Sequence, residues 1–316
     1  MSSMQPEGYD LIGDIHGHAE PLRGLLRRLG YRYRDGRFAH PTRQAIFLGD
    51  FIDRGPEQRG VLEVVRPMVM DGAALAVMGN HELNALAFHT PDPAAHGEHL
   101  RRRSAKNIDQ HRAFLDEHEH PEVLDAALEW FWDLPLWLDL GELRVVHAAW
   151  DTPALNRITD RVAPGNRLTQ PLLEAASRPG TAEQNAVENL LKGIEAELPA
   201  GHGFSDKDGH HRRYIRLKWW RYPQGETWRS MFLGPPGVAA KLPEAPLPPD
   251  VETGYPDTAP PVFVGHYWMV GEPTPQAANV ACLDYSVARD GGRLVAYRWD
   301  GEQVLRDDKF DWVERR

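Results

Sequence analysis

Three short runs of the sequence place Asp, His or Asn beside glycine directly after an apolar stretch. They read Gly-Asp-Ile-His-Gly-His at residues 13–18, Gly-Asp-Phe-Ile-Asp-Arg-Gly at 49–55 and Gly-Asn-His-Glu at 79–82. Polar residues that follow buried parallel strands lie together at one edge of an α/β sheet, where such sheets build their sites. One run of this kind could arise by chance, but three in succession predict a metal centre at that edge.

The predicted centre has enough ligands for two divalent cations that share a bridging carboxylate. Asp14 and His16 alternate at one strand end, so both side chains can face the same ion. Asp50 ends the neighbouring strand and is the natural bridge. The second ion would be held by Asn80, His147 and His266. Mixed carboxylate, imidazole and amide ligands favour Mn²⁺, with Fe and Zn²⁺ as alternatives. A pair of such metal ions activates a bridging water and neutralises phosphate oxygens during in-line attack.

The elements that must position these ligands are visible as an alternation of strand and helix patterns up to about residue 90. Strands are predicted to end at Ile12, Leu48 and Met78, and helices to cover residues 20–29, 57–70 and 82–88. This order is typical of a mostly parallel sheet with helices on its faces. Residues 105–133 predict two helices separated at Pro121, and a strand pair at 136–140 and 143–146 then delivers His147.

From residue 152 to about residue 260 the pattern changes, and we interpret this region as an insertion or cap over the site within a single domain of residues 1–316. It contains a helical pattern at 182–198, a hairpin-like turn at 206–209 and a proline-rich loop at 235–261. A core strand at 262–264 then delivers His266. Antiparallel strands that finish a second sheet are predicted at 279–283, 293–298 and 303–306.

Composition limits the classes of protein to which the chain can belong. With 41% hydrophobic and 26% charged residues, it can form a sizeable core. The formal net charge of -10 argues against wrapping of duplex DNA, although a local basic patch for a phosphate-bearing substrate is compatible with it. The single cysteine, Cys282, excludes an internal disulfide and is expected to be a small buried residue. No membrane span or signal-peptide pattern is present, so we expect a cytoplasmic enzyme without a membrane partner.

Together with Val-His-Ala at 146–148 and Gly-His at 265–266, the three runs resemble the five motifs of the calcineurin-like metallophosphoesterases. Within that superfamily they are similar to the branch of the phosphoprotein phosphatases and the symmetrical diadenosine-tetraphosphate hydrolases. The resemblance extends over residues 13–266, with 152–260 outside it. It implies an α/β fold, the four-layer α/β/β/α sandwich, with an inserted cap-like region. It also implies a metal-dependent hydrolase of phosphoester or phosphoanhydride bonds.

The resemblance implies the same two groups of metal ligands and assigns roles to three neighbouring residues. His81 would be the general acid that protonates the leaving oxygen, and Asp53 would be the carboxylate that orients it. Arg54 would bind the substrate phosphate. Side-chain chemistry agrees, because histidine is a suitable acid near neutral pH and a guanidinium group binds phosphate in a bidentate fork.

The sequence departs from the family pattern at three places. Trp268 stands where many metallophosphoesterases have a second histidine, which favours the phosphoprotein-phosphatase branch. The pair Ala148-Ala149 follows His147, where protein phosphatases have Gly-Gly and the tetraphosphate hydrolases Ala-Gly. The second phosphate-binding arginine of the protein phosphatases is not recognisable, and we interpret Arg216 and Lys218, on one face of a predicted strand, as its substitutes.

Several other residues are expected to have structural roles or to be exposed to solvent. Glu82 is expected to support the site by hydrogen bonding, and Trp219 and Trp220 are expected to pack under the insertion, with stacking on a nucleobase as the alternative. Solvated helix faces are predicted for His89, His96, His99, His111, His118 and His120.

Three classes of function remain open at this point. The leading one is a dinuclear phosphoesterase that acts on a phosphorylated small molecule or nucleotide such as a dinucleoside polyphosphate. Its alternative within the same chemistry is a phosphoserine or phosphothreonine protein phosphatase, because the two groups share these motifs. A non-catalytic metal-binding module is disfavoured by the complete ligand set, and a zinc hydrolase of carbon–nitrogen or ester bonds is disfavoured by Arg54 beside the site.

Overall fold

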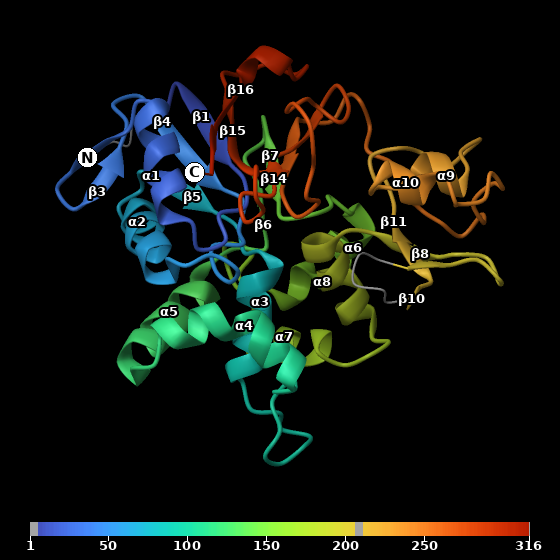
Figure 1. Cartoon of the computed structure of the whole chain (residues 1–316), viewed down its shortest axis with the longest axis horizontal. Coiled ribbons are helices and arrows are strands. Elements are labelled where there is room, and N and C mark those ends of the chain that lie inside the picture. Colours follow the sequence, from blue (N-terminus) through green and yellow to red (C-terminus); the bar gives the residue numbers. More distant parts are fainter. Residues whose placement is uncertain (1–5, 206–210, 316) are drawn as a thin grey trace.

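The computed structural model describes residues 6–205 and 211–315, and the predicted turn at 206–209 lies outside them. Two β-sheets form the centre of the molecule (Figure 1). In the first sheet, β1 (Gly8–Ile12), β4 (Arg43–Phe47) and β5 (Ala74–Ala76) run parallel, as the alternation of strand and helix predicts. Their ends are in register, since Ile12 pairs with Phe47 and Phe47 pairs with Ala76.

The far edge of the first sheet is antiparallel. It consists of β15 (Arg293–Trp299) beside β1, with β14 (Asp284–Tyr285) and β16 (Phe310–Glu314) paired to β15. The prediction that 293–298 belongs to the second sheet is therefore wrong, and residues 303–306 form no strand. Antiparallel order is correct for β15, but hydrophobic alternation does not tell which sheet a strand will join.

The second sheet has the order β13-β12-β7-β6. Its strands are β6 (Trp137–Asp139), β7 (Arg144–Val146), β12 (Val262–Val264) and β13 (Val280–Cys282). The predicted hairpin of β6 and β7 is present. β12 runs parallel to both β7 and β13, so the antiparallel prediction for 279–283 is wrong.

Side-chain alternation divides the core between the two faces of each sheet. Leu11 and Ile46 lie in an apolar cluster with Val145 and Phe263 of the second sheet, and this cluster fills the space between the sheets. Neighbouring side chains on the same strands, such as Ile12, point into the other cluster, which the helices cover. The sheets are thus the two inner layers of a four-layer α/β/β/α sandwich, and the predicted fold class is confirmed.

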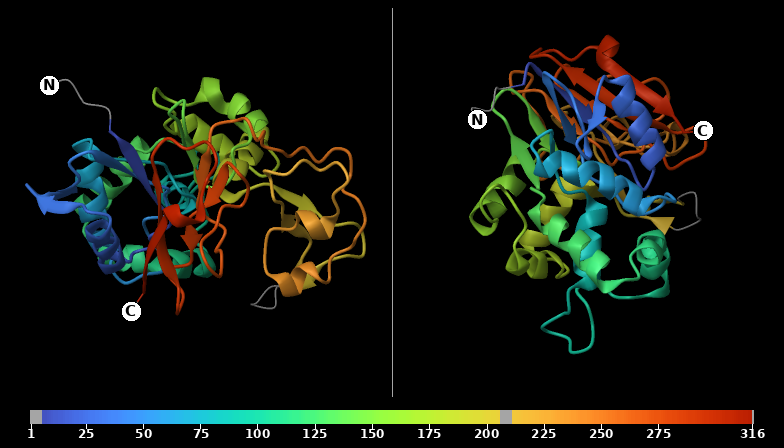
Figure 2. Two further views of the ribbon diagram at one scale, coloured as in Figure 1. Left: turned by 90° about the horizontal axis from the view of Figure 1, so that it is seen from above. Right: turned by 90° about the vertical axis from the view of Figure 1, so that its left-hand side faces the viewer.

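The outer layers are helical (Figure 2). On the side of the first sheet lie α1 (Ala19–Arg28) and α2 (Gln58–Met70), and α3 (Asn80–His89), α4 (Ala105–Glu117) and α5 (Pro121–Asp133) follow β5 in the chain. A second group comprises α6 (Thr152–Ile158), α7 (Gln170–Ala176) and α8 (Ala182–Lys192). Only α8 was predicted from the sequence. The helix predicted to reach residue 198 ends earlier, because Gly193 adopts a φ of 85° and a strand follows.

The later part of the insertion forms a lobe beside the sheets, at the right in Figure 1. Its elements are β8 (Glu195–Glu197), β9 (Phe204–Ser205), β10 (His211–Arg212), β11 (Tyr214–Arg216), α9 (Trp228–Met231) and α10 (Pro236–Ala239). The lobe has its own small core around Ile215, Trp228 and Met231. By contrast, α6 to α8 pack into the cluster that the helices of the main body share.

The remaining elements are a hairpin of β2 (Arg32–Arg34) and β3 (Arg37–Ala39) and two 3₁₀ turns at Thr159–Arg161 and Asp307–Lys309. Among the described residues, no helix combines the length and the apolar character that crossing a membrane requires.

Candidate metal centre

Five strand ends deliver the six predicted metal ligands to one place. The side chains follow β1, β4, β5, β7 and β12, and they are almost completely buried: Asp14, His16, Asp50, Asn80, His147 and His266. Because the ends of parallel strands of each sheet meet at one edge, and the two sheets face each other, residues far apart in the sequence converge. The structure thus brings together all six residues that the sequence singled out.

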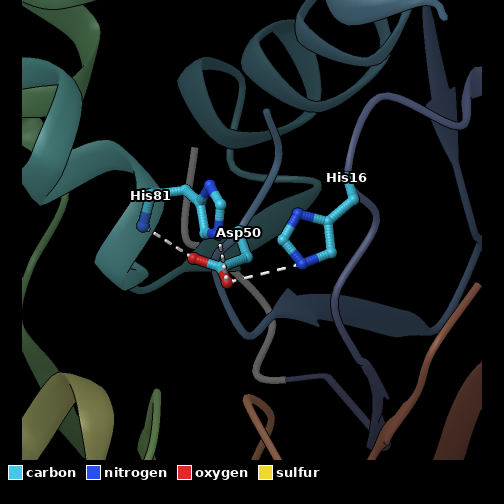
Figure 3. Close-up of side chains that lie close together, drawn as sticks. All are labelled: His16, Asp50 and His81. Atoms are coloured by element: carbon cyan, nitrogen blue, oxygen red, sulfur yellow. Dashed lines mark hydrogen bonds and ion pairs between the residues drawn. The ribbon is translucent and has the colours of Figure 1, made fainter. Parts of the chain in front are cut away.

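Asp50 occupies the middle of this group. Its Oδ2 lies 3.6 Å from Nε2 of His16 and 3.4 Å from Nε2 of His147, which come from different sheets. Figure 3 shows the rings of His16 and His81 next to each other beside the Asp50 carboxylate, with ring centres 4.7 Å apart. Two groups of side chains that could each hold an ion share Asp50, one with His16 and His81 and one with His147 and His266. This is the position expected of a bridging carboxylate.

The outer ligands extend the cluster on both sides of Asp50. Oδ2 of Asp14 lies 4.0 Å from Nε2 of His16. Oδ1 of Asn80 lies 2.7 Å from Nδ1 of His266 and 3.3 Å from Nε2 of His147. The amide oxygen and the two imidazoles can therefore face one ion, while Asp14 and His16 face another.

The surroundings orient two of the imidazoles for ligation. Nδ1–H of His16 donates to the Ile52 carbonyl at 3.0 Å, and Nδ1–H of His147 donates to the Leu48 carbonyl at 2.7 Å. Each bond places the ring proton on Nδ1 and turns the Nε2 lone pair towards Asp50. Within the described residues, Nε2 of His16 and Nε2 of His266 are buried without a hydrogen-bond partner. Buried nitrogens of this kind fit a divalent metal.

The balance of charge also fits a cation. Burial raises the pKa of Asp14 well above its ordinary value, and the nearby Asp284 adds to the effect. Burial opposes ionisation of Asp50, yet the histidines around it, led by His147, hold its pKa well below the ordinary value. Burial lowers the pKa of His16 to about 3, which keeps this imidazole neutral and able to act as a ligand. A group of buried carboxylates that draws in positive charge is suited to metal ions.

The backbone around the centre is held in a rare conformation. His16, Asp50 and His266 have positive φ angles of 45°, 51° and 71°, and Asp53 and Arg54 have 68° and 70°. Left-handed backbone is unfavourable for residues other than glycine and persists where the surrounding structure enforces it, often at functional sites. Gly79 is required for a different reason, since a Cβ there would collide with the Asp50 carboxylate.

Glu82 lies beneath Asp50 and orders the loop that carries it. Its carboxylate accepts hydrogen bonds from the backbone N–H groups of Asp50, Phe51 and Gly79, at 2.9, 2.8 and 2.9 Å. Burial, with Asp50 close by, raises the pKa of Glu82 to about 7. The contacts match the supporting role that the sequence suggested.

His81 and Asp53 form a hydrogen-bonded pair at the mouth of the centre. Nδ1–H of His81 donates to Oδ2 of Asp53 at 2.6 Å, and Nε2 of His81 faces Oδ2 of Asp50 at 3.9 Å. Burial disfavours the charged form of His81, but the carboxylates, above all Asp50, raise its pKa. The bond to Asp53 therefore fixes the ring of His81 so that its Nε2 faces Asp50.

His111 was predicted to be a solvated helix residue, and this prediction is wrong. The side chain is buried, and its Nδ1–H donates to Oδ1 of Asp53 at 2.7 Å. Against the effect of burial, the hydrogen bonds from His111 and His81 hold the pKa of Asp53 below its ordinary value. His118, directly after the same helix, is also buried and stacks on Phe114. Most residues next to these two histidines in the sequence are polar, so the sequence does not indicate that this side of the helix is buried.

Asp284 is a second residue that the sequence did not single out. Its buried carboxylate accepts hydrogen bonds from the backbone N–H groups of Trp268 and Ser286, each at 2.8 Å. It ties the loop after His266 to the turn after β14. Its place in a short strand close to the chain end provides no sequence signal for such a role.

The three predicted phosphate-binding cations have different surroundings. Arg54 is exposed, and its Cζ lies 4.3 Å from the centre of the Trp268 ring. Arg216 lies close enough to lower the pKa of His266, after burial as the main cause, and faces Glu195 at 3.7 Å. Nζ of Lys218 donates to the Ser230 carbonyl at 2.9 Å, within the insertion. The predictions for Arg216 and Lys218 remain predictions.

A cavity of about 730 Å³ lies between the insertion and the loop that follows His266. Trp220, Tyr222 and Tyr255 line it together with Lys218 and Arg221. Trp219, by contrast, is 1% exposed and packs in the main core against Trp220 and Tyr255. Packing is thus the role of Trp219, whereas Trp220 borders a space that can hold a planar ring.

Two curated relatives share part of this chain. A protein of Oceanobacillus iheyensis named asymmetrical bis(5'-nucleosyl)-tetraphosphatase PrpE is 31% identical over 140 residues, which are 44% of this chain and 54% of the relative. The protein of the same name from Bacillus subtilis is 31% identical over 159 residues, which are 49% of this chain and 62% of the relative. The chain spans about half the length of the curated relatives it matches.

A solved structure and a family model also match this chain. A serine/threonine phosphatase from Saccharomyces cerevisiae, described as similar to human PP5, has a TM-score of 0.53 and 14% identity, covering 99% of this chain and 81% of that one. At this identity the likeness concerns the fold alone. The family model for calcineurin-like phosphoesterases matches residues 10–223, which include five of the six candidate ligands and His81. The chain is therefore a member of the calcineurin-like phosphoesterase family.

Proposed function

We propose that the protein hydrolyses a phosphoanhydride bond of a dinucleoside polyphosphate, with two divalent metal ions held by the six ligands around Asp50. Mn²⁺ is the first candidate for both ions, and Fe or Zn²⁺ are the alternatives. The observation that carries the proposal is the position of Asp50 between His16 and His147, with the His81–Asp53 pair beside it. When bound, the ions would activate a water molecule and neutralise phosphate oxygens.

The side chains around the ligands supply the remaining functions. Asp53 fixes the ring of His81 through Nδ1, so that Nε2 is the nitrogen that donates a proton to the leaving oxygen. Arg54 lies at the exposed rim, where its guanidinium group can bind the phosphoryl oxygens. The ligands are almost completely buried, which limits the access of bulk water and strengthens these electrostatic interactions.

Two observations favour a nucleotide over a phosphoprotein substrate. The curated relatives are named as nucleosyl tetraphosphatases. The cavity next to the loop after His266 has aromatic walls at Trp220, Tyr222 and Tyr255, which suit a nucleobase.

The proposal is tested by hydrolysis of a panel of substrates with chelator-treated protein reloaded with Mn²⁺. The panel contains p-nitrophenyl phosphate, its bis ester, diadenosine tetraphosphate and a phosphoserine/phosphothreonine peptide. We expect kcat/KM for the dinucleotide to exceed the others by a hundredfold or more, and the chelated protein to be inactive. The products distinguish symmetrical cleavage, which gives two ADP, from asymmetrical cleavage, which gives ATP and AMP. A preference for the peptide would instead identify a protein phosphatase.

The variant His81→Asn tests the role of the proposed acid. It should lower kcat by roughly 10²–10⁴-fold, as loss of a general acid does, while both metal ions remain bound. The exposed His120 provides a matched control, since His120→Asn should retain full activity. Turnover of His81→Asn at the wild-type rate would show that the acid has been assigned wrongly.

A further inference from the structure

We propose that Arg289 is a second phosphate-binding residue, which holds the phosphate next to the one at the metal centre and thereby selects substrates with linked phosphates. The inference rests on the proposed function and adds a residue that determines specificity within it. The alternation of a predicted strand pointed to Arg216 and Lys218 for a second cation, whereas Arg289 lies outside the motifs of the family.

The observation behind this inference is a pair of arginines on one tryptophan. The guanidinium carbon of Arg54 lies 4.3 Å from the centre of the Trp268 ring, and that of Arg289 lies 4.5 Å from the same centre. Stacking on an indole ring orients a guanidinium group and leaves its N–H groups at the edge available to an anion. The two guanidinium groups are at most about 9 Å apart, the sum of these distances.

Both arginines lack a competing carboxylate. Each side chain is exposed, and neither has an ion-pair partner within residues 6–205 and 211–315. Their neighbours differ, since Arg293 pairs with Glu272 and Arg315 pairs with Asp290. Two unpaired cations held close together repel each other, and an anionic ligand would relieve that repulsion.

Hydrogen bonds connect the backbone segment that carries Trp268 to the segment that carries Arg289. Both oxygens of the buried Asp284 are used, one by the N–H of Trp268 and one by the N–H of Ser286, each at 2.8 Å. The N–H of Arg289 in turn donates to the Ser286 carbonyl at 2.8 Å. Asp284 therefore fixes the spacing of the indole ring and the second guanidinium group, so that the pair is preorganised for a ligand.

Arg54 lies nearer to the metal ligands in this arrangement and Arg289 lies farther away, and this order indicates the chemical class of the substrate. Arg54 follows Asp53, which is bonded to His81, and it contributes to the electrostatics of His81 and His16. Arg289 lies on Trp268, two residues beyond His266. A phosphate at the metal ligands would meet Arg54, and only a second phosphate linked to it would reach Arg289. A simple monoester has no such group.

The experiment compares Arg289→Gln with Arg27→Gln. Arg27 is a matched control, because its guanidinium carbon lies 5.9 Å from the centre of the Phe38 ring on an unrelated surface. We expect Arg289→Gln to raise KM for diadenosine tetraphosphate at least tenfold and to change kcat/KM for p-nitrophenyl phosphate less than twofold. Trp268→Leu removes the ring that supports both arginines, so it should impair hydrolysis of both substrates, whereas Arg27→Gln should change neither.

A binding measurement separates this inference from the proposed function. Calorimetry with inorganic tripolyphosphate and with orthophosphate is done on the wild type and on Arg289→Gln, and the variant should lose affinity for tripolyphosphate only. If the wild type fails to cleave the dinucleotide but this selective loss occurs, the proposed function is wrong and the role of Arg289 stands. Equal effects on both phosphates, or no effect on either, would overturn the inference.

Discussion

At the scale of single residues, the buried carboxylates of the centre are stabilised by hydrogen bonds from neighbouring groups. Asp53 illustrates this, since each of its oxygens accepts a hydrogen bond from a different histidine, His81 or His111. A buried carboxylate is tolerated only when such partners satisfy it. His111 thus acts on the proposed acid through Asp53, although it does not contact the metal ligands.

The variant His111→Phe tests this positioning role. Phenylalanine keeps the ring stacked on Phe114 but leaves Oδ1 of Asp53 without its partner. We expect kcat to fall about tenfold with KM nearly unchanged, the range typical for loss of a group that orients a catalytic residue. The pH–rate profile should also shift, because the partner of His81 is altered.

His118→Phe is the matched control for this change. His118 stacks on the same Phe114 ring and bonds the Phe114 carbonyl, without contact to Asp53. A similar loss of kcat in both variants would mean that the aromatic stack matters and the bond to Asp53 does not.

At the scale of elements, the position of Asp50 depends on a close approach between two loops that follow strands. The two backbones are nearer to each other than a side chain on either would allow. The loops after β4 and β5 meet at Gly49 and Gly79, where either Cβ would contact the opposite backbone. This close approach places Asp50 above the start of α3, where the N–H of His81 donates to its Oδ1 at 2.9 Å. The glycine of each motif is therefore as necessary as its ligand.

The variant Gly79→Ala should disrupt this junction. The added methyl group collides with the carboxylate of Asp50, so Asp50 must move from the bridging position. We expect a loss of one or both bound metal ions, measured by elemental analysis, and a stability lower by roughly 1–3 kcal/mol, the usual effect of overpacking.

Gly237→Ala serves as the control, because nothing lies within 4 Å of a Cβ built at that position. It should retain the metal content and stability of the wild type. Full metal loading of Gly79→Ala would show that the loop adapts and that the glycine is dispensable.

At the scale of the whole molecule, stability should depend on pH through histidines that are at least half-buried and have no carboxylate partner. His89, at the end of α3, is an example, since burial lowers its pKa to about 4, with His111 and Arg103 adding to the effect. The unfolded chain takes up a proton at His89 near its ordinary pKa of 6.5, whereas the folded chain does so only near 4. The contribution of neutral His89 to stability is therefore complete above pH 6.5 and is lost as the pH falls towards 4.

The variant His89→Gln measures this contribution. Between pH 7 and pH 5 the free energy of unfolding of the wild type should fall by up to about 1 kcal/mol more than that of the variant, because solvent screens part of the charge on this half-buried ring; urea titrations at both pH values measure the difference. His96 is exposed, and His96→Gln should follow the wild type. Equal acid sensitivity in His89→Gln and the wild type would exclude His89 as a cause.

Much of the fold and of the centre could be predicted because the relevant signals are local. A short apolar run followed by a glycine and a ligand marks a buried strand end wherever it occurs, so Asp14, Asp50 and His147 could be identified from adjacent residues alone. The same locality explains why α2, α4 and α5 were predicted nearly to their ends.

What the sequence by itself determined was therefore the set of strand ends and the ligands they carry. Only the tertiary structure decided that β15 pairs with β1, that His111 reaches Asp53 and that Arg289 stacks on Trp268. The physical reason is distance along the chain: β1 and β15 pair across almost the whole sequence, and His111 lies 58 residues from Asp53. Such contacts arise from packing of completed elements, which leaves no pattern in neighbouring residues.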